Sequence, residues 1–280
     1  MWGRTSTSRF NYQQLENSHL VAGAITLQDK LSAKERLILP LDSDSLDEAK
    51  ILIKELKNHV GLFKVGLTLF VSHGFAAIKA VSEEVGDNKV FFDLKFLDIP
   101  QTVGSVSGAL ISAHGHGVKF VTVHTSEGER VIKSAVDAVA KGTNGTRVIG
   151  ITVLTSMSDQ DLRASGLYPQ QTVEARVLFL AGIARNAGAA GVVCSGHEAR
   201  AVKREFGEAF LVIAPGIRPR WSSVTRDDQR RVMTPSEAIQ AGVDYIVVGR
   251  PITQSSDHVG AAQRVLDEIE SALSSHPALA

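Results

Sequence analysis

The run from Phe91 to Pro100 places three charged side chains, those of Asp93, Lys95 and Asp98, in one of the most apolar parts of the chain. The residues before Asp93 have the composition of a buried strand, where a charge is costly unless it is paired or used in chemistry. Because successive side chains of a strand point to opposite faces, Phe91, Asp93 and Lys95 share one face. The pattern predicts an ammonium and a carboxylate side by side at a strand end, which indicates a chemical site.

A second lysine lies inside another apolar run, the sequence Leu-Phe-Lys-Val-Gly at 62–66. If Phe63 and Val65 face surrounding helices, then Lys64 faces the opposite side of the same strand. A buried lysine without a partner is rare in proteins. We therefore expect Lys64 to have a functional role.

Three further polar residues have both a functional and a structural interpretation. Asp42 follows an apolar run and could cap the next helix, but Asp44 or Ser45 could do so instead and leave Asp42 free. Asp98 could likewise cap the helix that begins near the next proline. Under that interpretation Thr102 is an ordinary surface residue.

The elements that must position these residues are short β-branched or aromatic runs that alternate with helical patterns from residue 36 onward. The predicted strands are 37–42, 61–66, 89–95, 120–124, 148–154, 191–194, 210–214 and 245–249. The predicted helices are 45–59, 68–85, 101–115, 127–141, 172–188, 197–206, 235–241 and 258–274. Eight strands, each followed by a helix, fit a (β/α)₈ TIM barrel. An open doubly wound sheet is the alternative, which the lack of a Gly-x-Gly-x-x-Gly motif after the first strand weakens.

In such a barrel the chemistry lies where strands end and the following loops begin. The segment 216–234 is a long loop after the seventh strand and carries several arginines, namely Arg218, Arg220, Arg226, Arg230 and Arg231. Long loops in compact domains are commonly functional. A solvated basic loop is the alternative, which would explain the charge of the segment but not its position. Together with the amides of Gly249 and Arg250, at the start of a short helix near Pro251, these arginines are expected to hold a phosphate dianion.

The length and composition of the chain limit the classes of protein to which it can belong. It has 280 residues, of which 30 are basic and 30 acidic, so nothing global suggests binding to nucleic acid or to an acidic membrane. Its single cysteine, Cys194, fits a reducing compartment and is expected to be a packed strand-end residue. No apolar run is long enough to span a bilayer, and no spacing of His, Cys and Asp matches a zinc site.

The N-terminal part of the chain is polar and lacks the continuous apolar stretch of a signal peptide. We predict that residues 1–34 are an extension, partly helical or disordered. Residues 35–280 are expected to form one catalytic barrel domain, since no linker-like stretch divides them.

Taken together, these motifs resemble the orotidine 5′-phosphate decarboxylase family of the bacterial type. The matching pieces are Leu-Asp at 41–42, Phe-Lys-Val-Gly at 63–66, Asp-Leu-Lys-Phe-Leu-Asp-Ile-Pro-Gln-Thr at 93–102, Val-His at 123–124, Thr-Val-Leu-Thr-Ser at 152–156, Pro-Gly-Ile-Arg-Pro at 215–219, Asp-Gln-Arg-Arg-Val-Met-Thr-Pro at 228–235 and Val-Gly-Arg at 248–250. The Asp-x-Lys-x-x-Asp motif also resembles that of metal-dependent ketose-phosphate barrels, which carry a glutamate where this chain has Lys64.

The resemblance implies loss of CO₂ from orotidine 5′-phosphate to give uridine 5′-phosphate, the last step of pyrimidine nucleotide synthesis, in the cytoplasm and without metal or organic cofactor. It implies that Lys95 gives the proton to C6 within a charge network formed by Lys64, Asp93, Lys95 and Asp98. It also implies a homodimer in which Asp98 and Thr102 complete the neighbouring site. The implied substrate contacts are Asp42 and Lys64 to the ribose, Thr155 to the pyrimidine, and Arg218, Gln229, Gly249 and Arg250 to the phosphate.

Two other functions remain open on the sequence. One is a metal-dependent lyase acting on a keto-sugar phosphate with the same scaffold, against which Lys64 argues. The other is a catalytically silent phosphate-binding barrel that acts as a regulator, against which the complete set of charged residues argues.

Overall fold

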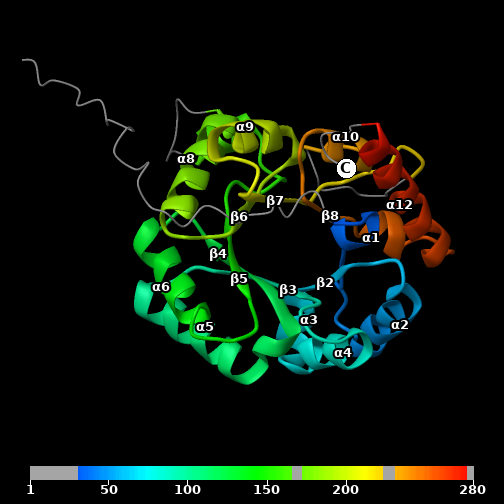
Figure 1. The fold of residues 1–280 in the computed structure, drawn as a ribbon, viewed down its shortest axis with the longest axis horizontal. Coiled ribbons are helices and arrows are strands. Elements are labelled where there is room, and N and C mark those ends of the chain that lie inside the picture. The colour runs from blue at the N-terminus through cyan, green and yellow to red at the C-terminus, as the bar shows by residue number, and fades with distance from the viewer. Residues whose placement is uncertain (1–30, 166–171, 223–230, 276–280) are drawn as a thin grey trace, which may run out of the picture.

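The computed structural model describes residues 31–165, 172–222 and 231–275. Within these ranges eight parallel strands form a closed barrel, in which each strand pairs with the next and the last pairs with the first (Figure 1). The strands are β1 (Leu37–Pro40), β2 (Leu62–Gly66), β3 (Val90–Phe96), β4 (Val118–His124), β5 (Arg147–Ile151), β6 (Gly191–Val193), β7 (Leu211–Ala214) and β8 (Tyr245–Val247). The predicted TIM barrel is confirmed, and the alternative of an open sheet is wrong.

Helices surround the barrel and follow the strands in sequence (Figure 1). Seven of them lie where the sequence predicts a helix: α2 (Leu46–Leu56), α5 (Pro100–His114), α6 (Glu129–Val139), α8 (Val173–Asn186), α9 (Gly196–Phe206), α10 (Pro235–Gln240) and α12 (His258–Ser274). The helix predicted at 68–85 is wrong as a single element, because it is divided into α3 (Leu67–His73) and α4 (Ala76–Val85). Gly74 ends α3 with a φ of 55°, a conformation that continues no helix and that glycine adopts readily.

Short helical segments complete the described elements: α1 (Ala33–Arg36), α7 (Asp159–Ala164), α11 (Arg250–Thr253) and a 3₁₀ turn, η3 (Gly115–Gly117). All four are too short to show a periodic apolar face. The sequence indicates α11 alone, through Pro251 in the first turn of that helix. In α1 and α7 a serine and an acidic residue three positions later form a capping box, which satisfies the first amide groups of the helix.

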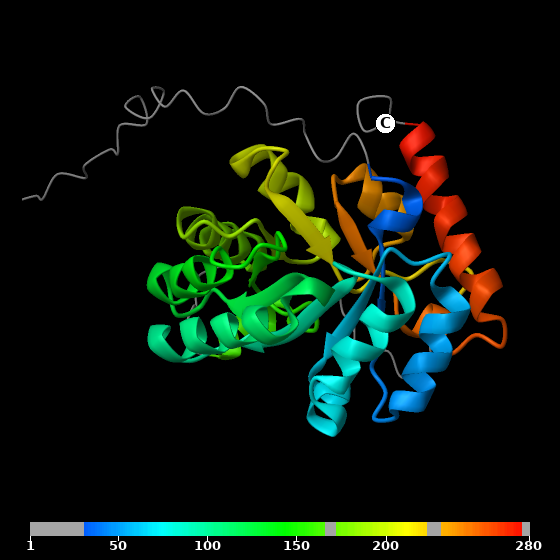
Figure 2. The same ribbon diagram turned by 60° about the horizontal axis from the view of Figure 1, so that its bottom comes forward.

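The last helix closes the ring of helices beside the first ones. α12 runs along one side of the barrel and packs against α1, α2 and α10 (Figure 2). Ala33 in α1 is buried, so the chain joins the packed structure at this helix. Residues 1–30 lie outside the described residues, and the boundary of the extension at residue 34 stays a prediction.

Several strands end earlier than predicted. β1 ends at Pro40, β5 at Ile151 and β8 at Val247, whereas the predictions extend two or three residues further. The difference arises because buried apolar side chains continue beyond the hydrogen-bonded ladder into the loops, as those of Leu41 and Val153 do. Such loops read as strand in the sequence although their backbone has left the sheet.

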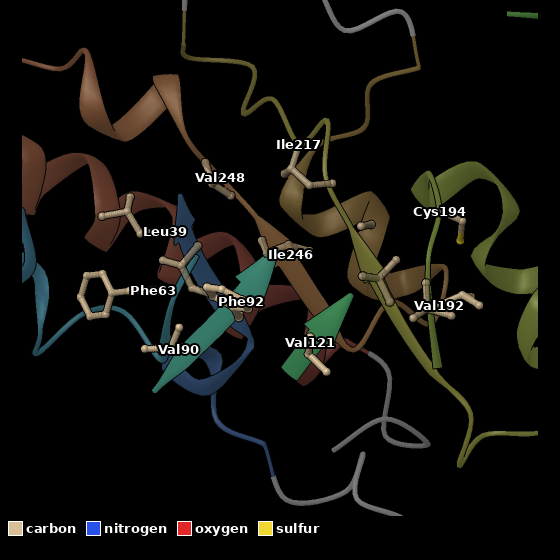
Figure 3. Packing of buried hydrophobic residues seen from close by; sticks show 14 of the residues in the cluster. Leu39, Phe63, Val90, Phe92, Val121, Val192, Cys194, Ile217, Ile246 and Val248 are labelled. Carbon is tan, nitrogen blue, oxygen red and sulfur yellow. The ribbon is translucent and has the colours of Figure 1, made fainter. Parts of the chain in front are cut away.

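The core has two layers, one on each side of the barrel wall. Inside the barrel a small cluster of side chains includes Phe91, Phe120 and Tyr245. A larger cluster lies between the strands and the helices, and residues of both contribute to it. Phe63 and Phe92 belong to this outer cluster (Figure 3). The alternation predicted for β2 and β3 is thus confirmed, since Phe63 and Phe92 point outward and Phe91 points inward.

Candidate active site

Four charged side chains form a continuous row of contacts at the carboxyl ends of β1, β2 and β3. Lys64 Nζ donates to Asp42 Oδ1 at 2.9 Å and lies 3.7 Å from Asp93 Oδ2. The same oxygen of Asp93 accepts a hydrogen bond of 2.8 Å from Lys95 Nζ. The structure therefore brings together Asp42, Lys64, Asp93 and Lys95. In this order each side chain contacts the next, and the charges alternate in sign.

The backbone at Lys95 has an uncommon conformation that directs this side chain. Lys95 has a φ of 54°, which non-glycine residues rarely adopt, and the pairing of β3 with β4 shifts register between Phe92 and Phe96. Such a bulge bends a strand and re-aims one side chain, and backbone strain of this kind is found at functional sites. The conformation is held by Thr122, which accepts a hydrogen bond of 2.8 Å from Lys95 N and donates one of 3.1 Å to Asp93 Oδ1.

Thr122 is a site residue that the sequence analysis missed. It is fully buried on β4, between the inward-facing Phe120 and the terminal His124. The signal that could have found it is a polar side chain in register with the inner face of a predicted strand.

Opposite charges dominate the electrostatics around Lys64. Its side chain is only 12% exposed, and that of Asp93 only 9%. Burial alone lowers the pKa of Lys64, but the carboxylates of Asp93 and Asp42 outweigh it and raise the pKa above its ordinary value. Lys64 therefore stays an ammonium and fixes the two carboxylates on either side of it.

These charged residues line one wall of a cavity of about 1040 Å³ at the carboxyl end of the barrel. The cavity is also lined by Thr155, Arg218, Gly249 and Arg250, which are the residues expected to bind pyrimidine and phosphate. Gly249 precedes α11, and Arg250 is its first residue. Of the expected phosphate contacts, Gln229 lies outside the described residues.

Asp98 and Thr102 stand apart from this cavity within one chain. Neither residue lines it, and Asp98 is exposed. The residue at the N-cap position of α5 is Ile99, and Asp98 Oδ1 accepts a hydrogen bond of 2.6 Å from Ile99 N. Asp98 is therefore not the helix cap that the alternative interpretation requires.

The remaining candidate groups have structural explanations. Cys194 is buried, and burial raises the pKa of its thiol, so it is a packed residue rather than a nucleophile. His124 lies at the end of β4, where burial and then the charge of Lys95 lower its pKa. Over residues 31–165, 172–222 and 231–275, no three His, Cys, Asp or Glu side chains are placed to share a metal ion.

Comparison with known proteins agrees with this geometry. Residues 35–265 match the sequence model of the orotidine 5′-phosphate decarboxylase / HUMPS family. The chain belongs to this family. The matched range contains every residue of the candidate site, and the resemblance inferred from the motifs is confirmed.

Individual relatives narrow the position of the chain within the family. It is 44% identical over 242 residues to an orotidine 5′-phosphate decarboxylase of Desulfosudis oleivorans, covering 86% of this chain and 95% of the relative. It is 44% identical over 238 residues to that of Idiomarina loihiensis, covering 85% and 99%. The crystal structure of the decarboxylase from Lactobacillus acidophilus has a TM-score of 0.70 and 36% identity, covering 83% of this chain and 98% of the other.

Proposed function

We propose that the row of charged side chains formed by Lys64, Asp93 and Lys95 removes CO₂ from orotidine 5′-phosphate and protonates the carbanion that remains. The product is uridine 5′-phosphate, and the overall reaction is that of the decarboxylases to which the chain is related. This reaction is the last step of pyrimidine nucleotide synthesis. The observation that carries the proposal is the pair of Lys95 and Asp93, whose charged atoms lie 2.8 Å apart and which both line the cavity.

The chemical step needs a stabilised negative charge on C6. The bond between C6 and the carboxylate breaks, CO₂ leaves, and the electron pair stays on C6. The ammonium of Lys95 stabilises this charge and then transfers a proton to C6, after which it regains a proton from solvent. No metal or organic cofactor takes part, because a preorganised ammonium replaces the electron sink that a cofactor would provide.

Asp93 and Lys64 prepare Lys95 for this role. The carboxylate of Asp93 accepts from Lys95 and from Thr122, so it holds the ammonium at one place on the barrel wall. Lys64 balances the charge of Asp93 from the other side at 3.7 Å. A preorganised arrangement of this kind needs no reorganisation when the charge develops.

The rest of the cavity binds the parts of the substrate that do not react. Asp42 and Lys64 contact the ribose, Thr155 the edge of the pyrimidine, and Arg218, Gln229, Gly249 and Arg250 the phosphate. Binding energy from the phosphate can thereby align the base at Lys95.

A second copy of the chain completes the site. Asp98 lies outside its own cavity, and it is flanked by Leu97 and Ile99, whose side chains are 54% and 63% exposed. Leu67 and Val71 on α3 are also largely exposed. Large exposed apolar side chains of this kind indicate an interaction surface. A homodimer that buries them would bring Asp98 and Thr102 into the neighbouring cavity.

The location predicted for the chain, the cytoplasm, rests on the pathway in which the family acts. Among the helices that the structure describes, none is long and apolar enough to cross a membrane.

The proposal is tested by following the loss of absorbance of orotidine 5′-phosphate with purified enzyme that has been dialysed against EDTA. Full turnover after EDTA treatment, with uridine 5′-phosphate as the only nucleotide product, is the expected result. Turnover that disappears and returns with a divalent cation would instead favour the metal-dependent lyase. Lys64 already argues against that function, since the metal-dependent barrels that share the motif carry a glutamate there.

A further inference from the structure

Arg231 connects two elements beside the cavity that are far apart in the sequence. Its Nη1 donates to Glu198 Oε1 at 2.5 Å, and its Nη2 lies 3.2 Å from the carbonyl oxygen of Leu154 and 3.4 Å from that of Val153. The side chain of Arg231 is 13% exposed and that of Glu198 only 5%. A largely buried charge pair thus joins the start of α9 to the loop after β5.

The loop after β5 forms part of the proposed pyrimidine site. Val153, Leu154 and Thr155 all line the cavity, whereas Arg231 itself does not. Arg231 therefore reaches the cavity only through the backbone of this loop. Its hydrogen bonds to two successive carbonyl groups fix the backbone directly before Thr155.

The backbone that carries Arg231 is also tied to the proposed phosphate site. Arg218 N donates to Met233 O at 2.8 Å, and Met233 N donates to Gly216 O at 3.4 Å. The segment around Arg231 is in this way bound to the residues that follow β7. One side chain consequently links the loop that bears Thr155 to the loop that bears Arg218.

Glu198 holds the guanidinium in this orientation. Its second oxygen, Oε2, accepts a hydrogen bond of 3.0 Å from Ser195 N, as part of the capping box of α9. The carboxylate is therefore fixed by its own helix, independently of the arginine. A lysine could satisfy Glu198 as a point charge, but only the planar fork of arginine can bind Glu198 and the two carbonyl groups together.

We propose that Arg231 is a positioning residue for the decarboxylation, which sets the distance between the pyrimidine-binding and phosphate-binding loops. The inference rests on the proposed roles of Thr155 and Arg218. Its physical basis is that a small displacement of a substrate-binding group lowers the rate strongly, even when the group that moved is outside the reacting centre.

The test is the variant Arg231→Lys, which keeps a positive charge for Glu198 but loses the bonds to the loop after β5. We expect a melting temperature close to that of the wild type and a fall of about tenfold in kcat/KM for orotidine 5′-phosphate. The matched control is Arg200→Lys. Arg200 is an exposed arginine on α9 that also donates to a backbone carbonyl, that of Gln240, and its replacement should change neither quantity. An Arg231→Lys enzyme with wild-type kcat/KM overturns the proposal.

A second variant keeps the test valid if Arg231→Lys does not fold. The double variant Glu198→Gln with Arg231→Met removes both charges, so no buried charge is left without a partner. It should fold and show a similar fall in kcat/KM. Wild-type turnover in this variant would also overturn the proposal.

A cycle with Thr155→Val shows whether Arg231 acts through Thr155. If it does, the loss in kcat/KM of the double variant Thr155→Val with Arg231→Lys is smaller than the product of the two single losses. If Thr155→Val is impaired and the double variant loses as much as the product of the two single losses, the positioning role of Arg231 is overturned. The proposed role of Thr155 then stands. A Thr155→Val enzyme with full activity overturns the proposed role of Thr155 and this inference with it.

Discussion

Asp93 and Lys95 are only two residues apart on β3, yet their charged atoms lie 2.8 Å from each other. Two residues on one face of a regular strand have parallel side chains that point away from the sheet. The bulge before Phe96 and the φ of 54° at Lys95 change this direction. Thr122 holds the changed backbone, so the ion pair depends on β4 as much as on β3.

The first prediction concerns Lys95. Lys95→Ala should lower kcat by at least about 10²–10³, the usual loss on removal of one preorganised electrostatic donor, because the proposed mechanism also takes the proton from this residue. Binding of uridine 5′-phosphate, measured by calorimetry, should weaken much less, since the proposed contacts to ribose and phosphate do not involve Lys95. Near-normal turnover in this variant would exclude the proposed mechanism.

The second prediction concerns the phosphate. Arg250→Ala and Arg218→Ala should lower kcat/KM for orotidine 5′-phosphate, because binding energy at the phosphate assists the reaction at C6. Both variants should lose much less with orotidine, which has no phosphate to bind. Equal turnover of orotidine and its monophosphate by the wild-type enzyme would show that Arg218 and Arg250 are misassigned.

The third prediction separates a shared site from a site within one chain. Lys95→Ala and Asp98→Ala chains are unfolded together, refolded and assayed against each variant refolded alone. With random mixing about half of the dimers are heterodimers, each with one intact site, so roughly a quarter of the wild-type activity should return. No recovery, with heterodimers detected by mass spectrometry, would mean that Asp98 does not serve the neighbouring site.

The fourth prediction concerns the stability of the barrel away from the cavity. Lys203 Nζ and Asp244 Oδ2 form an ion pair of 2.7 Å, with side chains 4% and 0% exposed. Lys203→Met leaves the carboxylate of Asp244 buried without this partner and should lower the free energy of unfolding by about 3–5 kcal/mol. Urea denaturation measures this change, and kcat should stay unaltered because neither residue lines the cavity.

The matched control for Lys203 is Lys57→Met. Lys57 pairs with Glu84 on the surface, where both side chains are more than a third exposed. Exposed pairs contribute little to stability, so this variant should unfold at the wild-type urea concentration. A loss as large as that of Lys203→Met would show that the effect does not come from burial.

The fifth prediction concerns pH. Burial and the charge of Lys95 lower the pKa of His124 below its ordinary value of 6.5, so the unfolded chain binds a proton more readily than the folded one. The contribution of a neutral His124 is complete above about pH 6.5 and is lost as the pH falls through that value toward the folded pKa. Relative to His124→Gln, the wild type should lose stability between pH 7.5 and pH 5.5. If the difference in urea midpoint between the wild type and His124→Gln stays constant across this pH range, the lowered pKa of His124 is contradicted.

Much of the fold could be predicted because the local signals agree with one another. The apolar runs at β2 and β3 have the alternation of strands with one inner and one outer face, and Phe63, Phe91 and Phe92 lie on the predicted sides. The helical patterns between them are long enough to be periodic. Where the signal is a single residue, as at Gly74, the apolar pattern predicts one helix although the structure has two.

The sequence by itself identified the charged side chains that we propose to carry the chemistry. Lys64, Asp93 and Lys95 are charges in apolar strands, and this conflict is visible without any structure. Their order along the chain also places them at the same end of the barrel, since every parallel strand ends there.

Only the tertiary structure decided how these residues meet. The positive φ of Lys95, the support from Thr122 and the bridge from Arg231 to the loop after β5 join residues that are distant in the sequence. A pattern within one strand or loop holds no information about such contacts, because they depend on the register of neighbouring strands and on where loops return. That is why the charges could be found from the sequence, whereas the geometry that makes them a site could not.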